Sequence, residues 1–584
     1  MKAVILAAIA VLAVITMSAC SGGGTPPPPP PSGPTVTVSP ATANVQEGST
    51  QQFTATVTNT TATTVNWQVN GVTGGNATVG TISSTGLYTA PNVVPSPASI
   101  TVTAVLQADT AVTGNSIVTI TKVVFNNSSL KGTYIFSLSG VDLNGFGFYA
   151  VGAITADGNG NITAGAEDFN DLSSGYAQAT SLSGTYNVTS DGRGTLTFTN
   201  SISNTPFSFA FALRALNSGA LNETDTNVVA GTGSLEQQAT GVATPSGNYA
   251  YGYSGTGNCG PFNAAGIFAL SGAVLGGTQD LNCGGSITKS QSLSGSYGSV
   301  GAMGRGTGKF TSAVGSLNFV YYVVSANRYR LLCTNAATFF LGTADLQTQP
   351  SFANNNFNGN YVVNISANTS QGGVSYTLIQ FNASGGNVSS GHYDVNDTGT
   401  VGQASLSGAY SLNSSGRISG TFNVNGASLP FAMYLISPSQ AYYVDERTSL
   451  IGGGNVYAQA SAVTANAAWA GSYATKQFGY FVAAGGILAI NATSISGQIS
   501  ADGNGNLAGT LDINDPPPLN IVLNQTLQGT YSVGNVAPGR TTLSITTPQD
   551  GTRTFVGYII DPTRVLLLET DAGLTAGGDA VRQF

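Results

Sequence analysis

The sequence has few charged residues, few of them basic, and a single histidine. The shortage of basic residues and that of histidine each exclude a kind of site. Charged side chains make up 7% of the 584 residues, and 17 Lys and Arg face 25 Asp and Glu, giving a net charge of −8. This balance lacks the basic surface that nucleic-acid binding requires, so no nucleic-acid partner is expected. The single histidine, His392, also excludes zinc sites built from several histidine ligands.

Glycine and short apolar runs are abundant instead. There are 77 glycines, and the apolar residues, 41% of the chain, occur in short runs bounded by Gly, Ser, Thr, Asn and Asp. Short runs of this kind with turn residues between them predict an all-β protein. A chain of this length also predicts several domains rather than one core.

A long repeat organises most of the chain. The turn arginines Arg193, Arg305, Arg417 and Arg540 follow one another at intervals of 112, 112 and 123 residues within similar stretches such as LSGTYNVTSDGRGTLTF. A fixed long period outranks local motifs in deciding architecture. We predict four β-repeats, at residues 127–238, 239–349, 350–459 and 460–584.

Eight strands are predicted in the first repeat, all joined by short turns and so antiparallel hairpins. They are expected at 132–139, 146–156, 161–170, 178–189, 194–200, 206–214, 219–225 and 231–238. Eight sequential strands close most simply into an up-and-down barrel, which removes exposed edges. Because Gly-x-Tyr occurs twice in each repeat, an eight-bladed β-propeller is the alternative.

The N-terminus carries an export signal. Lys2 is followed by the apolar run 3–15, which predicts a signal peptide over 1–19. The sequence Met17-Ser18-Ala19-Cys20 resembles the lipobox of bacterial lipoproteins. The resemblance implies that Cys20 is lipidated, and Ser21 after it implies sorting to the outer membrane or cell surface. An ordinary signal peptide cut nearby is the alternative.

A linker and a sandwich domain follow. Residues 20–34 are rich in Gly and Pro, which predicts a flexible start and then an extended polyproline spacer. Alternating short strands over 35–122 predict a β-sandwich. Its segment GTISSTGLYTAP resembles bacterial immunoglobulin-like domains of group 2. Trp67 is the expected core tryptophan, and the segment has no cysteine for an inter-sheet disulfide.

Three cysteines lie in the second repeat. Export makes oxidation the expectation, and Cys259 and Cys283 fall in turns at the same predicted barrel end. We predict a disulfide between them, with Cys333 free and buried. A Cys283–Cys333 bridge is the alternative, because Cys333 ends its strand near the same rim.

Acidic residues form the only regular candidate site. Each repeat keeps Asp-x-Asn at the end of its third strand, beginning at Asp168, Asp280, Asp394 and Asp512. Carboxylates there could meet those ending the seventh strand around a cation; the alternative is that they accept backbone hydrogen bonds and stop the strand. The turns from Asp157 and Asp502 resemble the start of a calcium loop but lack its later ligands. We predict no metal and no cofactor.

The sixth strand of each repeat is apolar on both faces. One face, with Phe209 and Phe211 in the first repeat, predicts a filled barrel. The other face, with Tyr434 and Tyr558 in later repeats, predicts packing between successive repeats into a stiff rod. An exposed tyrosine platform is the alternative, and the turn arginines are expected at exposed positions, Arg193 near Asp157.

No catalytic constellation stands out. A Ser-His-Asp triad would have to use His392 with Asp394, yet the other repeats have Ala or Thr at the histidine position. We therefore expect no enzyme but a surface lipoprotein with a display or adhesion role. Its expected partners are a membrane, through the lipid anchor, and an extracellular glycan or protein. The alternatives are a carrier of a small apolar ligand in the barrels and a hydrolase of extracellular polymers.

Overall fold

The structure is a computed structural model that describes residues 33–584, except 204, 216, 217, 227, 313, 314, 462, 484, 485 and 516–519. The signal, Cys20 and most of the linker lie outside this part. Within it the only helices are four single 3-10 turns: η1 (Asn127–Ser129), η2 (Ala302–Gly304), η3 (Asn354–Asn356) and η4 (Asn466–Ala468). None of these described helices has the length and apolar character needed to cross a membrane.

An immunoglobulin-like sandwich comes first. A five-stranded sheet, in the order β2-β11-β10-β5-β6, packs against the pair β1-β4 and the sheet β3-β9-β8-β7. Trp67 is buried in the single core between them, as predicted. The strands are β1 (Thr35–Ser39), β2 (Thr42–Gln46), β3 (Thr50–Gln52), β4 (Thr54–Thr58), β5 (Val65–Val69), β6 (Val72–Thr73), β7 (Gly75–Asn76), β8 (Gly80–Ile82), β9 (Leu87–Thr89), β10 (Ser99–Leu106) and β11 (Thr113–Thr121).

Barrel 1 follows the sandwich. Its fourth strand is divided into β15 and β16, which both pair with β14, and pairing of β13 with β12 and β14 closes the sheet. The strands are β12 (Lys131–Asp142), β13 (Gly147–Asp157), β14 (Asn161–Asp171), β15 (Gly175–Ala179), β16 (Leu182–Val188), β17 (Arg193–Asn200), β18 (Phe207–Arg214), β19 (Ser218–Glu223) and β20 (Val228–Gln237).

Three more closed eight-stranded barrels follow, each with its strands in sequence order, so the propeller alternative is wrong. Barrel 2 has β21 (Gly247–Gly257), β22 (Gly260–Ser271), β23 (Val274–Cys283), β24 (Ser286–Tyr297), β25 (Arg305–Ser312), β26 (Gly315–Ser325), β27 (Arg328–Cys333) and β28 (Phe339–Leu346). Barrel 3 has β29 (Gly359–Thr369), β30 (Val374–Ser384), β31 (Asn387–Asp397), β32 (Thr400–Leu412), β33 (Arg417–Val424), β34 (Ala427–Ser437), β35 (Gln440–Asp445) and β36 (Leu450–Ala458). Barrel 4 has β37 (Ala470–Ala483), β38 (Gly486–Asp502), β39 (Asn506–Asp515), β40 (Asn520–Val533), β41 (Arg540–Thr547), β42 (Gly551–Asp561), β43 (Arg564–Glu569) and β44 (Leu574–Arg582).

The two Gly-x-Tyr motifs of a repeat use glycine for different reasons. The first glycine opens the barrel with a positive φ that favours glycine, as at Gly132 (107°) and Gly471 (127°). The second leaves no room for a side chain, because a Cβ on Gly184 would stand 2.0 Å from the Thr197 carbonyl oxygen of the neighbouring strand. The motif therefore marks the start of the barrel and a close approach of two strands within it.

Each barrel is filled by its own side chains. The inward face of the sixth strand is buried, with Phe209 and Phe211 in barrel 1 and Phe431 and Met433 in barrel 3. These residues belong to one continuous apolar cluster per barrel. The prediction of filled barrels is confirmed.

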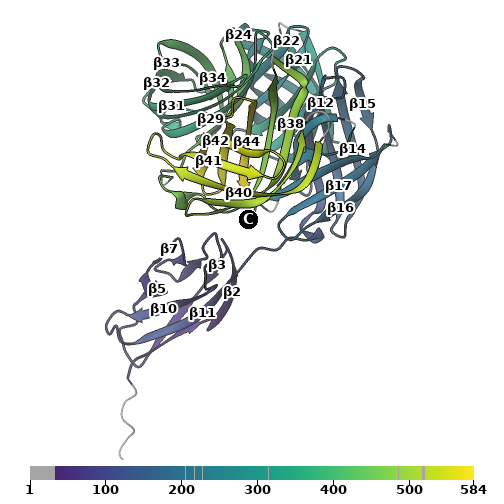
Figure 1. Ribbon diagram of the computed structural model, residues 1–584. Helices are drawn as coiled ribbons and strands as arrows, with labels where there is room; N and C mark the ends of the chain where they lie inside the picture. Colours follow the sequence, from purple (N-terminus) through teal and green to yellow (C-terminus); the bar gives the residue numbers. More distant parts are fainter. Residues whose placement is uncertain are drawn as a thin grey trace, which may run out of the picture.

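The four barrels form a closed ring rather than a rod. Barrel 4 contacts barrel 1 directly, because Asn514 donates to the Glu223 carbonyl at 2.9 Å and Asn222 donates to the Asp512 carbonyl at 3.0 Å. Figure 1 shows the barrels grouped together above the immunoglobulin-like domain, which a single stretch of chain joins to them. Arg582 of barrel 4 also donates to Asn92 of that domain at 2.6 Å.

Candidate functional site

Each contact between neighbouring barrels, which we call a seam, is built on the Asp-x-Asn motif. In seam 1/2, Asp168 of barrel 1 accepts two hydrogen bonds from Arg305 of barrel 2, at 2.7 and 2.8 Å, and one from Tyr322 at 2.7 Å. Seams 2/3 and 3/4 repeat this arrangement with Asp280, Arg417 and Tyr434 and with Asp394, Arg540 and Tyr558.

The asparagine of the motif binds backbone across the same seam. Asn282 of barrel 2 donates from its amide to the carbonyls of Asp445, Arg447 and Leu450 in barrel 3, each at 2.9 Å. Its own side-chain oxygen accepts from the Gly285 N–H. The third strand of one barrel therefore meets the end of the seventh strand of the next barrel, rather than that of its own.

A glutamine at the end of each repeat makes a second contact across the seam. Gln238, for example, donates to the carbonyls of Met303 and Val323 in barrel 2, at 3.1 and 2.7 Å. Gln583, at the end of barrel 4, donates in the same way to the carbonyls of Asp191 and Leu213 in barrel 1. The ring thus uses one set of contacts four times, with Gln238, Gln347, Gln459 and Gln583.

The outer apolar stripe lies in the seams, so the prediction that it packs successive barrels is confirmed. Tyr434 and Tyr558 are fully buried, each against apolar residues of the preceding barrel. The alternative of an exposed tyrosine platform is therefore wrong. The expected rod is also wrong, because the angle between successive barrels brings the fourth barrel back to the first.

These contacts bear on both interpretations of the acidic residues. The carboxylates of Asp168, Asp280 and Asp394 bind arginine and tyrosine of the next barrel instead of meeting the seventh strand of their own barrel around a cation. The alternative holds in part, because Asp280 also accepts a backbone hydrogen bond from the Ser290 N–H at 2.6 Å. Among the described residues no group of His, Cys, Asp and Glu is arranged to hold a metal ion. The turn at Asp157 is held by Asn159 and Asn161, as expected of turn chemistry, and the same holds at Asp502.

The turn arginines are not exposed, which corrects the third interpretation. Arg193 does not approach Asp157: it contacts Asp191 of its own turn at 2.9 Å and Asp512 of barrel 4 at 3.2 Å. Its side chain is 10% exposed. The sequence signal for this role was the fixed distance from each Asp-x-Asn motif to the arginine of the next repeat, 137 residues in both seams 1/2 and 2/3.

His392 lies beside the seam carboxylate, 3.6 Å from Asp394. Burial by itself raises the pKa of Asp394, but the nearby His392 and the hydrogen bonds from Arg540 and Tyr558 lower this pKa to about 2. Because arginine and tyrosine from barrel 4 already occupy the carboxylate, His392 and Asp394 do not form the base of a catalytic triad.

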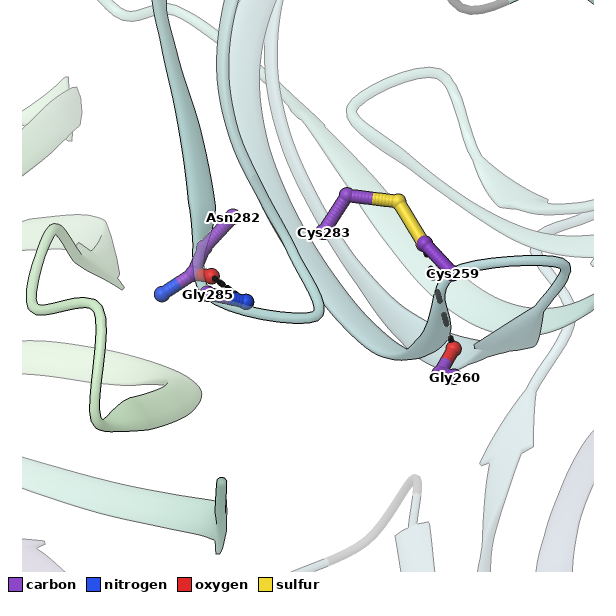
Figure 2. The surroundings of a disulfide bond; sticks show 5 residues. All are labelled: Cys259, Gly260, Asn282, Cys283 and Gly285. Carbon is purple, nitrogen blue, oxygen red and sulfur yellow. Dashed lines mark hydrogen bonds between the residues drawn. A yellow bond between two sulfur atoms is a disulfide. The ribbon is translucent and has the colours of Figure 1, made fainter.

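The disulfide has the predicted pairing. Cys259, in the turn between β21 and β22, is bonded to Cys283 at the end of β23, with a Cα–Cα distance of 5.7 Å, and Cys333 is free and buried. Figure 2 shows that the bond lies next to Asn282, the seam residue that precedes Cys283. The disulfide therefore joins two turns at the end of barrel 2 that carries the seam residue Asn282.

A cavity that the sequence did not reveal lies in the middle of the ring. One part, the basic chamber, has a volume of about 390 Å³ and is lined by residues of all four barrels. It contains five cationic side chains and three carboxylates. The cations are Arg214, Arg328, Arg330, Lys476 and Arg564, and the carboxylates are Glu236, Asp345 and Asp579.

The carboxylates of the basic chamber tie the barrels together. Glu236 of barrel 1 contacts Arg328 and Arg330 of barrel 2, at 2.9 and 2.7 Å. Burial by itself raises the pKa of Glu236, but the two guanidinium groups lower this pKa to about 2. Asp579 of barrel 4 accepts from Arg214 of barrel 1 at 2.6 Å. Both carboxylates are therefore charged and neutralised at neutral pH.

The other part of the cavity, the aromatic chamber, has a volume of about 540 Å³ and is also lined by all four barrels. It adjoins the basic chamber, because Arg330, Thr343, Asn364, Tyr442 and Asn455 line both. Its lining includes the aromatic rings of four residues and the side-chain amides of two: Tyr149, Tyr376, Phe478, Tyr480, Asn263 and Asn368. A concave site of this size, lined by aromatic rings and polar groups, could hold a small molecule.

Comparisons with known proteins do not assign the chain to a family. No protein-family model matches it, and no curated protein matches it either. Among solved structures, transferrin binding protein B of Neisseria meningitidis serogroup B is 10% identical, with 64% of this chain and 83% of that chain covered and a TM-score of 0.18. Eight immunoglobulin domains of the Down syndrome cell adhesion molecule are also 10% identical, covering 83% of this chain and 84% of that chain, with a TM-score of 0.13. Superpositions at these scores carry no argument about fold or function.

Proposed function

We propose that the chain is a surface lipoprotein that holds a rigid ring of barrels away from the membrane, in a display or adhesion role. The order of its parts carries the proposal: a lipobox ending at Cys20, a proline spacer, a sandwich domain and then the ring. Proline-rich segments extend as semi-rigid spacers, and a ring closed by four seams is suited to present a fixed surface.

Binding rather than catalysis is the role that the seams favour. Asp168, Asp280 and Asp394, the regular acidic residues of the chain, are used to hold barrels together. The sole histidine, His392, stands against one of these carboxylates. These groups are therefore engaged in structure, and we propose that the protein is not an enzyme.

The experiment is fractionation of cells that produce the wild type and Cys20→Ser. We expect the wild type to partition with membranes, to incorporate labelled fatty acid and to be cut by protease added to intact cells. Cys20→Ser should lose both the label and the membrane partition, whereas Cys333→Ser, a matched change at a buried thiol, should lose neither. Membrane partition of Cys20→Ser equal to that of the wild type would contradict the proposed anchor.

A further inference from the structure

We propose that the axial cavity of the ring binds an acidic saccharide, with a carboxylate or sulfate group in the basic chamber and sugar rings in the aromatic chamber. This inference does not depend on the lipid anchor or on the display role. It rests on the charge balance, the accessibility and the chemistry of the two chambers.

The charge balance of the basic chamber is the reverse of that of the chain. Five of the 17 Lys and Arg gather there with only three of the 25 Asp and Glu. A chain so poor in charge thus has an excess of two cations in one cavity. Unpaired charge in a protein interior is costly unless a counter-charge or water accompanies it, so this chamber is suited to an anion.

Within the part of the chain that the structure describes, Lys476 is the cation of the basic chamber that lacks a carboxylate partner. Its ammonium has no carboxylate within 4.0 Å among the described residues, and its hydrogen bond to the Gly233 carbonyl is long, at 3.4 Å. The carboxylate opposite it in register, Asp579, is held by Arg214 and by Arg564 at 3.6 Å. Lys476 is therefore the cation of the chamber that remains available to a ligand.

The chamber is open to solvent at the positions where a ligand would enter. The side chains of Arg328 and Arg564 are 38% and 29% exposed, whereas those of Arg214 and Asp579 are only 9% and 13% exposed. Guanidinium groups bind carboxylate and sulfate oxygens in paired hydrogen bonds. An anion entering past Arg328 and Arg564 would thus meet Lys476 within the chamber.

The aromatic chamber identifies the body of the ligand. Phe478 and Tyr480 of barrel 4 and Tyr149 and Tyr376 of barrels 1 and 3 supply ring faces, and asparagine amides supply donors and acceptors between them. The side-chain oxygen of Asn263 is buried and has no hydrogen-bond partner. Burial raises the pKa of Tyr149 and Tyr376 to about 12, so these hydroxyls stay neutral donors at neutral pH. Flat faces alternating with amides suit the apolar faces and hydroxyls of a sugar.

The pH dependence of binding has a defined sign. Burial is the main cause that lowers the pKa of Lys476 to about 8; Arg214, Arg330 and Arg564 contribute to the lowering, and Asp579 opposes it. Anion affinity should therefore fall as pH rises through about 8, because the ammonium loses its proton. Bound anion should in turn raise this pKa.

Titration calorimetry on the full-length protein in detergent tests the proposal, with a uronic-acid disaccharide, the corresponding neutral disaccharide, inorganic sulfate and inorganic phosphate as probes. We expect the uronic-acid disaccharide to bind at least tenfold more tightly than any other probe. Lys476→Gln should weaken this binding at least tenfold and remove its dependence on pH near 8. Lys476→Arg should restore binding, and Lys131→Gln, the same change at an exposed lysine outside the cavity, should leave it unchanged.

Three results would overturn the proposal. The first is that none of the probes binds, and the second is that Lys476→Gln binds as tightly as the wild type. The third is that sulfate or phosphate binds as tightly as the acidic disaccharide, which would make the chamber a site for inorganic anions only. Circular dichroism of Lys476→Gln and Lys476→Met establishes that a loss of binding is not a loss of the fold.

Discussion

The three seams between consecutive barrels differ from the seam that closes the ring. In seam 1/2 a bidentate arginine and a tyrosine hydroxyl converge on Asp168. In seam 4/1 Ala212 stands at the position of that tyrosine, opposite Arg193 in register, so Asp512 receives no tyrosine hydroxyl. Arg193 contacts Asp512 through one nitrogen, at 3.2 and 3.3 Å, and shares its charge with Asp191.

Seam 3/4 and the closing seam also differ in the charge state that their aspartate favours. The pKa of Asp394 in seam 3/4 is lowered to about 2, whereas burial raises the pKa of Asp512, and Asn524 and Arg193 offset this only in part. Consecutive barrels are joined by a short length of chain, while barrel 4 and barrel 1 meet only through folding. We therefore expect the seam with the weaker ion pair to open first.

The largest effect is expected from Asp168→Ala. Asp168 is fully buried, and its removal leaves Arg305, Tyr322 and Tyr176 without their shared acceptor. Removing one partner of a buried pair costs about 3–5 kcal/mol of unfolding free energy. Urea unfolding followed by tyrosine fluorescence measures it.

The matched variant at the closing seam is Asp512→Ala. Because Arg193 keeps Asp191, we expect a loss of about 1–2 kcal/mol, smaller than that of Asp168→Ala. Asp397→Ala, at an exposed position on β31, serves as the control. Equal losses at Asp168 and Asp512 would remove the distinction between the two kinds of seam.

Reduction of the disulfide should have the next largest effect. The bond closes a loop with a sequence separation of 24 residues, for which loop-closure entropy predicts about 3 kcal/mol. Since Cys283 follows Asn282, the loss should concentrate in seam 2/3. Hydrogen exchange should rise in β23 and β35 after reduction and stay unchanged in β39 and β19. Uniform loss of protection around the ring would show that the disulfide does not act on that seam.

Acid should weaken seam 3/4 while favouring the closing seam. The lowered pKa of Asp394 contributes stability above its ordinary value of 3.8, and this contribution, about 2 kcal/mol, is lost as pH falls towards 2. The raised pKa of Asp512 has the opposite sign, because protonation relieves its buried charge. Unfolding free energies between pH 2 and 6 should therefore vary less in Asp394→Asn than in the wild type, and more in Asp512→Asn. If the unfolding free energy of both variants depended on pH as it does in the wild type, these assignments would be contradicted.

Removal of calcium should leave the stability of the protein unchanged, which makes it the smallest of the expected effects. The Asp-x-Asn carboxylates are neutralised by arginine in all four seams, so a cation has no place there. Thermal unfolding with calcium and with chelator should give the same midpoint. A midpoint lowered by chelator would return these residues to the role of metal ligands.

The strands and barrels were predictable because their signals are local. Alternation along each strand marks an inner and an outer face, and turn residues mark every hairpin. The same local reasoning identified the outer stripe of Tyr434 and Tyr558 as a packing surface. Local reasoning failed for Asp168 and Arg193, because their partners lie in another repeat. A pattern within one repeat does not identify a partner in another.

The axial cavity left only a partly repeated signal. The position of Arg328 is again an arginine, Arg564, in barrel 4, but it is Ser218 in barrel 1 and Gln440 in barrel 3, according to their strand pairings. Compared repeat by repeat, such a position resembles variable surface. The charges become a site only because the ring turns these strands of all four barrels towards one space.

The sequence by itself determined an all-β chain with four repeats, eight strands in each, filled interiors and a disulfide within the second barrel. Only the tertiary structure decided that the barrels form a ring and that its centre is a cavity. The reason is geometric: the outer stripe requires each barrel to pack on the next, but a small change in the angle at each seam separates a rod from a ring. That angle is set jointly by the ion pairs, glutamines and apolar contacts of the seams, and the four together bring Gln583 onto barrel 1.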